Sequence, residues 1–313
     1  MSHKKLKSKT KRVRLLKVFL IITGAVVLTV GAFAFMILND VRNTVNDKIY
    51  EEITSIDASA TKAKIKNDEP VNILLLGVDE RENDKGRSDT MIVMTLDPNN
   101  DQMQLFSIPR DTEAEIIGDG RTTRINHAYA YGGSNMAVDT VENFLDVNFD
   151  YFIKVNMNGL SQLVDSVNGI TVRNYRAFTQ DGYHFPEGQT TLSGSHALSY
   201  VRMRKEDPKG DLGRNERQRQ VIEGIIEKGA NPNMINQVGD VMKVLGDNVN
   251  TNMDFEDIRN LATKYRNARN HITNYQMSGS SKTSSGMYLI EMSEEEIKKT
   301  SNMINNFTLE TKR

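Results

Sequence analysis

The chain has 313 residues and contains no cysteine. This absence excludes disulfide bonds, catalysis by a thiolate and zinc sites built from cysteine. Histidine is also scarce, with only five in the chain, and none of them is spaced as His-x-x-x-His or Glu-x-x-His. The sequence therefore argues against a zinc enzyme, and its chemistry has to come from other side chains.

An excess of one charge is missing as well. The formal net charge is -1, charged residues make up 26% of the chain, and hydrophobic residues make up 38%. This composition is ordinary for a folded protein, and it excludes the globally basic surface that is typical of nucleic-acid binders. We find no internal repeat, no low-complexity tract and no helix-turn-helix pattern, so nucleic acid is not an expected partner.

The N-terminal part has the pattern of a membrane anchor. Residues 1–17 contain eight Lys or Arg residues and no acidic residue, and residues 18–38 contain no charged residue. As a helix, the uncharged run would be roughly 31 Å long, which is enough to cross a bilayer. The positive-inside rule places residues 1–17 in the cytoplasm and everything after residue 40 outside the cell. A cleaved signal peptide is the alternative, but the apolar run is long for one and no Ala-x-Ala site ends it.

After the anchor, we interpret residues 39–69 as an extracellular stalk and residues 70–313 as one extracellular domain. Apolar runs bounded by turn residues predict strands at 71–77, 91–96, 102–108, 151–155, 272–277 and 287–290. Helical spacing predicts helices at 135–145, 157–167, 193–204, 215–228, 234–245 and 255–268, and a last one that begins at a capping box of Ser293 and Glu296. Strands alternate with helices, so the sequence favours a layered α/β fold.

A dense group of arginines follows residue 200 and is the strongest functional signal. It comprises Arg202, Arg204, Asp211, Arg214, Arg217 and Gln218. A guanidinium binds phosphate oxygens with two parallel hydrogen bonds. Arginines in a first helical turn oppose the helix dipole, so they need an anion or acidic partners. We interpret the group as a pyrophosphate site; a solvated charged face is the alternative.

Two upstream segments repeat this chemistry. The first contains Asp79, Arg87 and Asp89, and the second is Pro109-Arg110-Asp111. Asp79 follows the first predicted strand, Asp89 precedes the second, and Arg110 follows the third, so all of them fall at strand ends. Two carboxylates there could share a Mg²⁺ ion with the phosphate. Turn capping by the aspartates, and an ordinary surface pair of Arg110 with Asp89 or Asp111, are the alternatives.

Two other features leave their role open. His127 could act as a base near the site, but no partner is visible, which favours a structural hydrogen bond. The methionine and leucine stripes of the 234–268 helices could form core or line a slot for a lipid chain.

The motifs together resemble the LytR-CpsA-Psr family of Gram-positive envelope proteins. The matching segments run in family order from residue 71 to residue 221. They are Asn72–Asp79, Arg87–Thr90, Ser107–Thr112, Ile125–Gly133, Tyr200–Arg204 and Gly213–Gln218. No departure occurs at the core positions, and the anchor topology agrees.

This resemblance implies a phosphotransferase with an α/β/α layered fold around a central mixed sheet and a hydrophobic tunnel for a polyprenyl chain. The donor would be a wall teichoic acid or capsular polysaccharide on an undecaprenyl-pyrophosphate lipid, and the acceptor a muramic-acid hydroxyl of peptidoglycan. Neither the glycan nor an oligomeric state follows from the motifs. By the same resemblance, Mg²⁺, with Mn²⁺ as a substitute, would be held by Asp79, Asp89 and Asp211. The pyrophosphate would be bound by Arg87, Arg110, Arg202, Arg204, Arg214, Arg217 and Gln218.

Catalysis would rest on charge stabilisation by Arg110 and the metal, with Asp79 or Asp89 accepting the hydroxyl proton. A lipid-pyrophosphate hydrolase that uses the same residues is one alternative. A non-enzymatic envelope receptor or transcriptional attenuator is the other.

Overall fold

The computed structural model describes residues 45–80, 85–204, 207–229, 248–284 and 286–307, together with Asn43 and Gly246. The chain divides into two units, 1–44 and 45–313, and the description here concerns the second. The predicted cytoplasmic tail, the anchor at 18–38 and the predicted helix at 234–245 lie outside the described residues. Within the described ranges, no helix is both long enough and apolar enough to cross a membrane.

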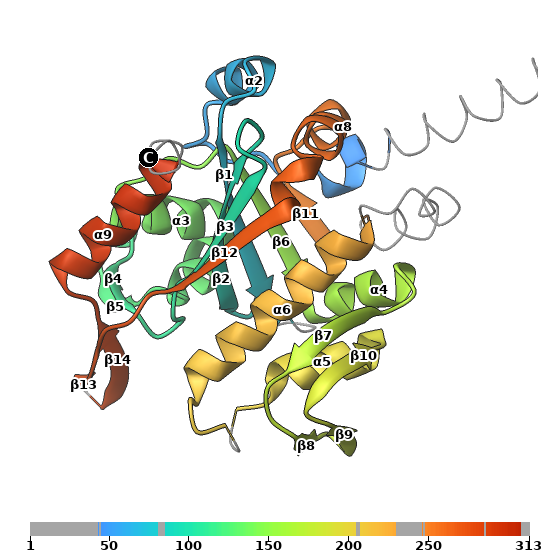
Figure 1. Ribbon diagram of the computed structural model, residues 1–313. Coiled ribbons are helices and arrows are strands. Elements are labelled where there is room, and N and C mark those ends of the chain that lie inside the picture. Colours follow the sequence, from blue (N-terminus) through green and yellow to red (C-terminus); the bar gives the residue numbers. More distant parts are fainter. Residues whose placement is uncertain are drawn as a thin grey trace, which may run out of the picture. The chain divides into compact units, whose positions relative to one another are not determined.

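A six-stranded mixed sheet forms the centre of the second unit (Figure 1). In spatial order its strands are β11 (Val249–Thr251), β6 (Tyr151–Asn156), β1 (Val71–Val78), β2 (Ser88–Asp97), β3 (Gln102–Ser107) and β12 (His271–Gln276). The pairs β1–β6 and β3–β12 are parallel, and the other neighbouring pairs are antiparallel. The ends of β1, β3, β6 and β12 and the start of β2 therefore meet at one edge of the sheet.

Helices cover both faces of this sheet, because alternate side chains of each strand point to opposite sides. On one face, Leu74 and Phe106 pack beneath α3 (His127–Leu145) and α9 (Glu294–Asn305). On the other face, Ile73 and Leu105 pack beneath α2 (Ala58–Lys66), α6 (Asp211–Gly229) and α8 (Phe255–Lys264), which the 3₁₀-helix η3 (Arg266–Asn270) follows. This arrangement confirms the predicted α/β fold with a central mixed sheet.

A smaller layer packs on the side of α6 that faces away from the sheet centre. It consists of α4 (Met157–Ser166), β7 (Ile170–Asn174), β8 (Phe178–Gln180), β9 (Tyr183–Phe185), β10 (Gly188–Leu192) and α5 (Gly194–Arg202). Its own apolar core includes Ile170, Phe185 and Tyr200, together with Val221 of α6. Helix α6 thus belongs to two cores at once.

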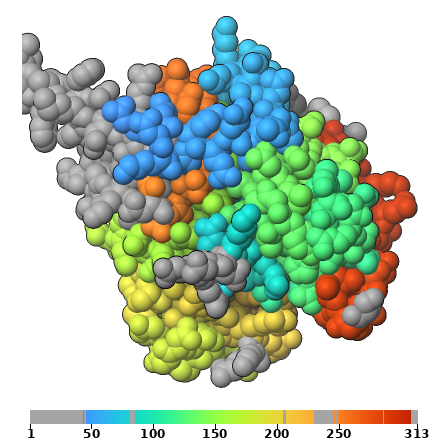
Figure 2. Space-filling model, turned by 180° about the vertical axis from the view of Figure 1, so that it is seen from behind, coloured from blue at the N-terminus to red at the C-terminus, as the bar shows by residue number. Residues whose placement is uncertain are grey.

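The segment before the first strand packs on this unit. It includes the π-helix η1 (Val45–Ile49), and the backbone N–H of Glu51 donates to the carbonyl of Thr251 over 2.8 Å. The backbone N–H of Thr54 donates to the side chain of Asn135, also over 2.8 Å. Viewed from behind, the blue surface of these residues adjoins the green surface of α3 (Figure 2). Residues 45–69, which we interpreted as a stalk from sequence, are grouped with the folded unit.

Most predicted strands match the structure to within a few residues, and the helix boundaries differ for identifiable reasons. Helix α3 begins at His127 rather than at 135, because a stretch before Gly133 is also helical; Gly133, with φ 70°, marks a kink where the second part starts. Helix α5 ends at Arg202, and α6 begins at Asp211 rather than at 215.

Helix α8 begins after Asp254, which forms a full capping box with Asp257. Ser293 forms only half of one, because the Glu296 carboxylate accepts from the Tyr275 hydroxyl. We did not predict the short strands β7 to β10, β4 (Glu113–Glu115), β5 (Thr122–Arg124) and β11, or β13 (Ser280–Ser284), which pairs with β14 (Met287–Glu291).

Candidate functional site

The loop between β1 and β2 places two aspartates at the same sheet edge. The backbone N–H of Asp79 donates to the carbonyl of Arg87 over 3.2 Å, which brings the two ends of the loop together. Gly86 makes this approach possible, because its φ is 69° and a Cβ there would lie 2.3 Å from the Asp79 carbonyl oxygen. The sequence had suggested that Asp89 precedes the second strand, but it is the second residue of β2.

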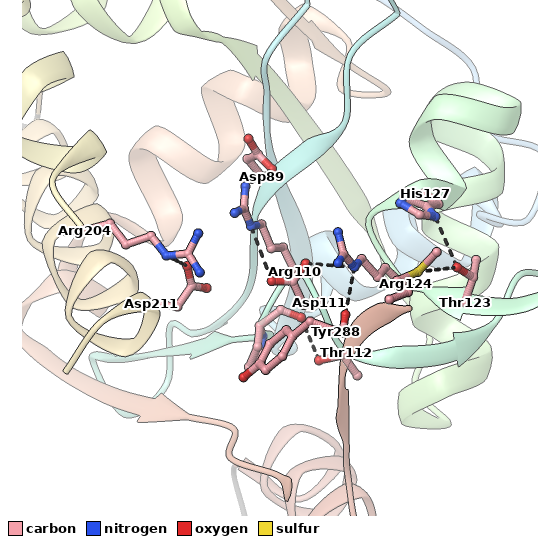
Figure 3. Close-up of polar contacts among 12 residues, drawn as sticks. Asp89, Arg110, Asp111, Thr112, Thr123, Arg124, His127, Arg204, Asp211 and Tyr288 are labelled. Carbon is pink, nitrogen blue, oxygen red and sulfur yellow. Dashed lines mark hydrogen bonds and ion pairs between the residues drawn. The ribbon is translucent and has the colours of Figure 1, made fainter. Parts of the chain in front are cut away.

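Arg110 is held against this edge by the turn that follows β3. Thr112 donates from its N–H and from its hydroxyl to the Pro109 carbonyl, over 3.0 and 2.6 Å. The Arg110 Nη1 atom then lies 2.7 Å from Oδ1 of Asp89, so the ion pair joins β2 to the end of β3 (Figure 3).

A second group of charges lies at the start of α6. Nη2 of Arg214 is 2.9 Å from Oδ1 of Asp211, and Nε of Arg204 is 3.6 Å from the same oxygen. Asp211 is the first residue of α6, which was predicted to begin only at residue 215. Its carboxylate therefore interacts favourably with the positive N-terminal end of the helix dipole and offsets the positive charge of the arginines that follow.

These two groups share one electrostatic environment. Burial lowers the pKa of Arg214, and Arg110 and Arg204 lower it further, while Asp211 and Asp89 raise it. Burial also lowers the pKa of Arg110, but the attraction of Asp89, together with Asp211, outweighs this and the net pKa is raised. Each arginine therefore experiences carboxylates from both groups. We call Asp89, Arg110, Arg204, Asp211 and Arg214 the arginine cage.

The arginine cage contains hydrogen-bond donors that the protein does not use. Among the described residues, buried Nε atoms of Arg110 and Arg214 and the buried Nδ2 atom of Asn215 have no hydrogen-bond partner. Buried polar atoms are almost always paired, so unused donors in two neighbouring arginines make this group a candidate site for an anion, although buried arginine donors without a partner in the described part of the chain also occur outside it, at Arg217 and Arg269.

Arg217 is not brought together with the arginine cage. Its Nη1 lies 2.6 Å from Oδ2 of Asp207, its Nη2 donates to the Met203 carbonyl over 2.6 Å, and its guanidinium lies 5.5 Å from the Phe178 ring centroid. Asp207 in turn packs on Gly213, where a Cβ would lie 1.8 Å from Oδ2 of Asp207. Arg217 and Gly213 therefore fix the segment that carries Arg204.

Two further predicted arginines lie apart from the cage. Arg202 is exposed at the end of α5 and makes no ion pair with any described residue, whereas Arg204 contacts Asp211. Arg202 is the last residue of α5, and Arg204 lies two residues beyond the end of this helix. Arg87 is exposed and contributes to the field around His127.

The three aspartates proposed as metal ligands do not form a preformed metal site. Within the part of the chain that the structure describes, no three acidic or histidine side chains gather around one possible metal position. Asp89 and Asp211 each hold an arginine. Because Mg²⁺ needs only one or two carboxylates when phosphate and water supply its other ligands, these two side chains fit an ion that is bound together with a phosphate.

An apolar cavity of about 220 Å³ opens beside the cage. It lies between the sheet, α4 and α6, and its lining includes Leu160, Val201, Val221, Ile222 and Ile225. Gln218 lines it too, one helical turn after Arg214, so the cavity and the cage meet along α6. Of the two helices considered for a lipid slot, α8 packs in the core through Ile258 and Leu261, and 234–245 lies outside the described residues.

Two further charged residues lie around the site; from the sequence we considered Asp111 only as a surface partner of Arg110, and we did not consider Arg219. Asp111 is buried and lies 3.3 Å from Nε of Arg124, through which it links the cage to β5. Arg219 is also buried, and its Nη1 donates to the Ser107 hydroxyl and to Gln276 at the same sheet edge. For Asp111, the signal was present in its place beside Arg110; for Arg219, the partners are too distant in sequence to be recognised.

A network of three polar side chains near the end of β1 was missed as well. The Tyr129 hydroxyl donates to Glu80, and Nζ of Lys154 donates to that hydroxyl over 3.0 Å. Burial raises the pKa of Tyr129, and the hydrogen bond to Glu80 raises it further. Glu80 follows Asp79 directly, so this network anchors the backbone beside a candidate site residue.

Comparison with known proteins identifies relatives over nearly the whole chain. The model of the LytR_cpsA_psr family matches residues 36–306. A protein of Bacillus licheniformis, named polyisoprenyl-teichoic acid–peptidoglycan teichoic acid transferase TagU, is 46% identical over 284 residues, which cover 91% of this chain and 92% of that protein. The crystal structure of B. subtilis TagU is similar with a TM-score of 0.63 and 44% identity, and the match covers 76% of this chain and 96% of that one. A structure of TagT bound to LIIa-WTA matches with a TM-score of 0.65 and 28% identity, over 76% of this chain and 90% of that one.

Proposed function

Because this chain belongs to the LytR-CpsA-Psr family, we propose that it is a transferase that attaches a teichoic-acid-type glycopolymer to peptidoglycan. The names of the TagU relatives support the reaction class. The structure of TagT bound to LIIa-WTA supports a glycopolymer as the transferred group.

One observation carries the proposal furthest: the arginine cage and the apolar cavity adjoin each other along α6, and Gln218 lies at their junction. A lipid pyrophosphate has the same two parts, an apolar chain and a compact group of negative charges. We propose that the polyprenyl chain enters the cavity and that its pyrophosphate lies in the cage. The unused donors of Arg110 and Arg214 would then bind phosphate oxygens.

In the proposed reaction, a hydroxyl oxygen of peptidoglycan attacks the phosphorus that carries the glycan. One P–O bond forms to the acceptor, and the bond from this phosphorus to the bridging oxygen breaks. The bridging oxygen keeps its electron pair, and polyprenyl phosphate leaves. The hydroxyl proton passes to a carboxylate, for which Asp79 and Asp89 are the candidates at the sheet edge.

The arginines of the cage would supply most of the rate enhancement in this mechanism. Charge builds up on the leaving phosphate, and fixed guanidinium groups stabilise it without having to reorganise. Asp89 and Asp211 have a second role here, because they hold Arg110 and Arg214 in place before substrate binds.

We further propose that Mg²⁺ binds with the substrate. Asp89 and Asp211 would hold it, with Asp79 as a third candidate, and Mn²⁺ would substitute for it in part. The ion would neutralise phosphate charge in the transition state.

The location of the enzyme is a proposal from the N-terminal sequence. The basic segment 1–17 and the uncharged segment 18–38 support a single-pass anchor with the catalytic unit outside the cell. Such an anchor would tether the catalytic unit to the membrane in which the lipid donor resides.

The experiment that tests the function uses the full-length chain in lipid vesicles with a lipid-linked teichoic acid precursor, peptidoglycan oligomers and Mg²⁺. We expect a covalent glycopolymer–peptidoglycan conjugate and the release of polyprenyl phosphate. If the rate of polyprenyl phosphate release does not depend on the acceptor concentration and no conjugate forms at any acceptor concentration, the protein is a lipid-pyrophosphate hydrolase. If the donor binds and stays intact, the protein is a receptor.

A further inference from the structure

A second positively charged surface lies next to the arginine cage, on the far side of Asp111. Oδ2 of Asp111 is 3.8 Å from Nε of Arg110, and its Oδ1 is 3.3 Å from Nε of Arg124. Nε of Arg124 also donates to the Tyr288 carbonyl over 3.0 Å, so its position is fixed from two sides. Figure 3 shows Arg124 and His127 on one side of Arg110, and Arg204 and Asp211 on the other. We call Arg87, Arg121, Arg124, His127 and Tyr131 the β5–α3 surface.

An exposed aromatic ring forms part of this surface. The side chain of Tyr131 is 38% exposed, and the guanidinium carbon of Arg121 lies 4.1 Å from its ring centroid. The ring of His127 lies 5.7 Å from the same centroid. Nδ1 of His127 is 3.3 Å from the Tyr131 hydroxyl and 3.2 Å from the Thr123 hydroxyl. These contacts hold the tyrosine in a defined orientation while part of it stays open to solvent, which suits stacking on the apolar face of a sugar ring.

The charge of the β5–α3 surface is positive and only partly balanced. Burial lowers the pKa of His127, and Arg87, Arg124 and Arg121 lower it further, while Asp111 raises it. Arg121 pairs with Asp119, and Arg124 pairs with Asp111. Arg87 is exposed and has no ion pair with a described residue. A ligand for this surface should therefore carry negative groups beside sugar rings.

The position of the surface relative to the cavity decides which substrate it would take. The cavity is lined by residues of β1, β2, β6, α4, α5 and α6, and the β5–α3 surface is built from the start of α3 and the segments before it. In Figure 1, α4 and α6 lie on one side of the sheet edge, and β5 and α3 on the other. In phosphoryl transfer, the attacking and the leaving oxygens are roughly in line with the phosphorus. If the leaving polyprenyl phosphate is on the cavity side of the cage, the attacking hydroxyl comes from the β5–α3 side.

We propose that the β5–α3 surface is the binding site for the acceptor, a peptidoglycan strand. A sugar ring would stack on Tyr131 beside Arg121, and carboxylates of the peptide stems would pair with Arg87 and Arg124. This inference rests on the proposed transferase function and adds to it the residues that receive the acceptor. It reassigns Arg87 from the pyrophosphate to the acceptor.

The test measures acceptor and donor kinetics separately for the full-length chain in vesicles. The variants are Arg87→Gln, Arg121→Gln and Tyr131→Ala, and the control is Arg259→Gln, an exposed arginine of α8 that pairs only with Glu256 among described residues. We expect Arg87→Gln to raise the KM for peptidoglycan oligomers by about tenfold, the scale of one lost charge-assisted contact. Tyr131→Ala should raise it by a similar factor because the stacking ring is lost, and Arg121→Gln because the cation that holds this ring is lost. The kcat, the KM for the lipid donor and the melting temperature should stay close to those of the wild type.

The outcomes separate this inference from the function on which it rests. An unchanged acceptor KM in all three variants, with wild-type transfer intact, would overturn the inference and leave the transferase function standing. A rise in the KM for the donor in place of the acceptor would overturn it too, because the surface would then hold the donor glycan. Absence of conjugate with the wild-type chain would instead remove the proposed function.

Discussion

Nη1 of Arg110 lies 2.7 Å from Oδ1 of Asp89, although the two residues come from different strands and are 21 positions apart. The pair joins β2 to the turn after β3, and it forms one side of the cage at this edge of the sheet. It also leaves Nε of Arg110 buried and without a hydrogen-bond partner among the described residues. Asp89 thus positions the guanidinium, and under the proposed function the unused Nε donor would bind a phosphate oxygen.

Replacement of Arg110 by alanine should therefore reduce catalysis much more than stability. We expect kcat for transfer to fall at least about a hundredfold, because a charge donor to the transition state is lost. The free energy of unfolding should fall by only about 1 kcal/mol, because the ion pair is partly exposed. Steady-state kinetics and thermal unfolding measure the two effects, and Arg259→Ala is the matched control. Transfer by Arg110→Ala at the wild-type rate would show that Arg110 forms only an ordinary surface ion pair and has no catalytic role.

The apolar cavity should be selective for the length of the lipid. Ile225→Trp places a bulky ring in a cavity of about 220 Å³. We expect the KM for a long-chain polyprenyl donor to rise by about tenfold or more, because chain burial is lost. The KM for a donor with a lipid too short to fill the cavity should hardly change. Equal effects on both donors would indicate that the lipid lies elsewhere.

Metal binding should depend on the lipid pyrophosphate. Among described residues the acidic side chains form no group of three around one position, so the protein alone should bind Mn²⁺ weakly. A non-reactive lipid pyrophosphate analogue should strengthen this binding, as measured by electron paramagnetic resonance of the ion. Asp211→Asn should weaken it, and EDTA should abolish transfer. Full transfer in excess EDTA would show that the arginines act without a metal.

His127 should make the folded protein sensitive to mild acid. Burial and the nearby arginines lower its pKa in the folded state, so the unfolded chain binds this proton more readily. The sign follows directly: stability is lost as the pH falls below about 6.5, the ordinary histidine pKa, and is retained above it. Thermal unfolding across this range should show a smaller pH dependence for His127→Gln than for the wild type. Equal slopes in both proteins would contradict the assignment.

The sequence predicted five of the six strands of the central sheet, because β1, β2, β3, β6 and β12 each contain apolar residues between turn residues; β11 was missed because it has only three residues. Strand β1 was expected at 71–77 and spans Val71–Val78, and a tight turn after Asp97 joins β2 to β3. The strands β7 to β10 were missed because they are short and partly exposed, so they lack a continuous apolar signal.

The site was predicted in composition more accurately than in geometry. Arg110, Arg204 and Arg214 meet two of the predicted aspartates, because helix and strand ends bring them to one edge. Arg217 was expected beside Arg214, but the Phe178 ring and Asp207 hold it on the other side of the segment. Such contacts depend on the packing of the smaller layer, which the local pattern of residues 211–218 does not encode.

The most direct test of the proposed transfer follows the origin of the attacking oxygen. The full-length chain would be incubated with the lipid-linked precursor and saturating peptidoglycan oligomers in heavy-oxygen water, and the products weighed by mass spectrometry. We predict a glycopolymer–peptidoglycan phosphodiester without heavy oxygen, together with an equal amount of unlabelled polyprenyl phosphate. A free glycopolymer phosphate that contains one heavy oxygen, with no conjugate, would show that water is the acceptor and would contradict the transferase function.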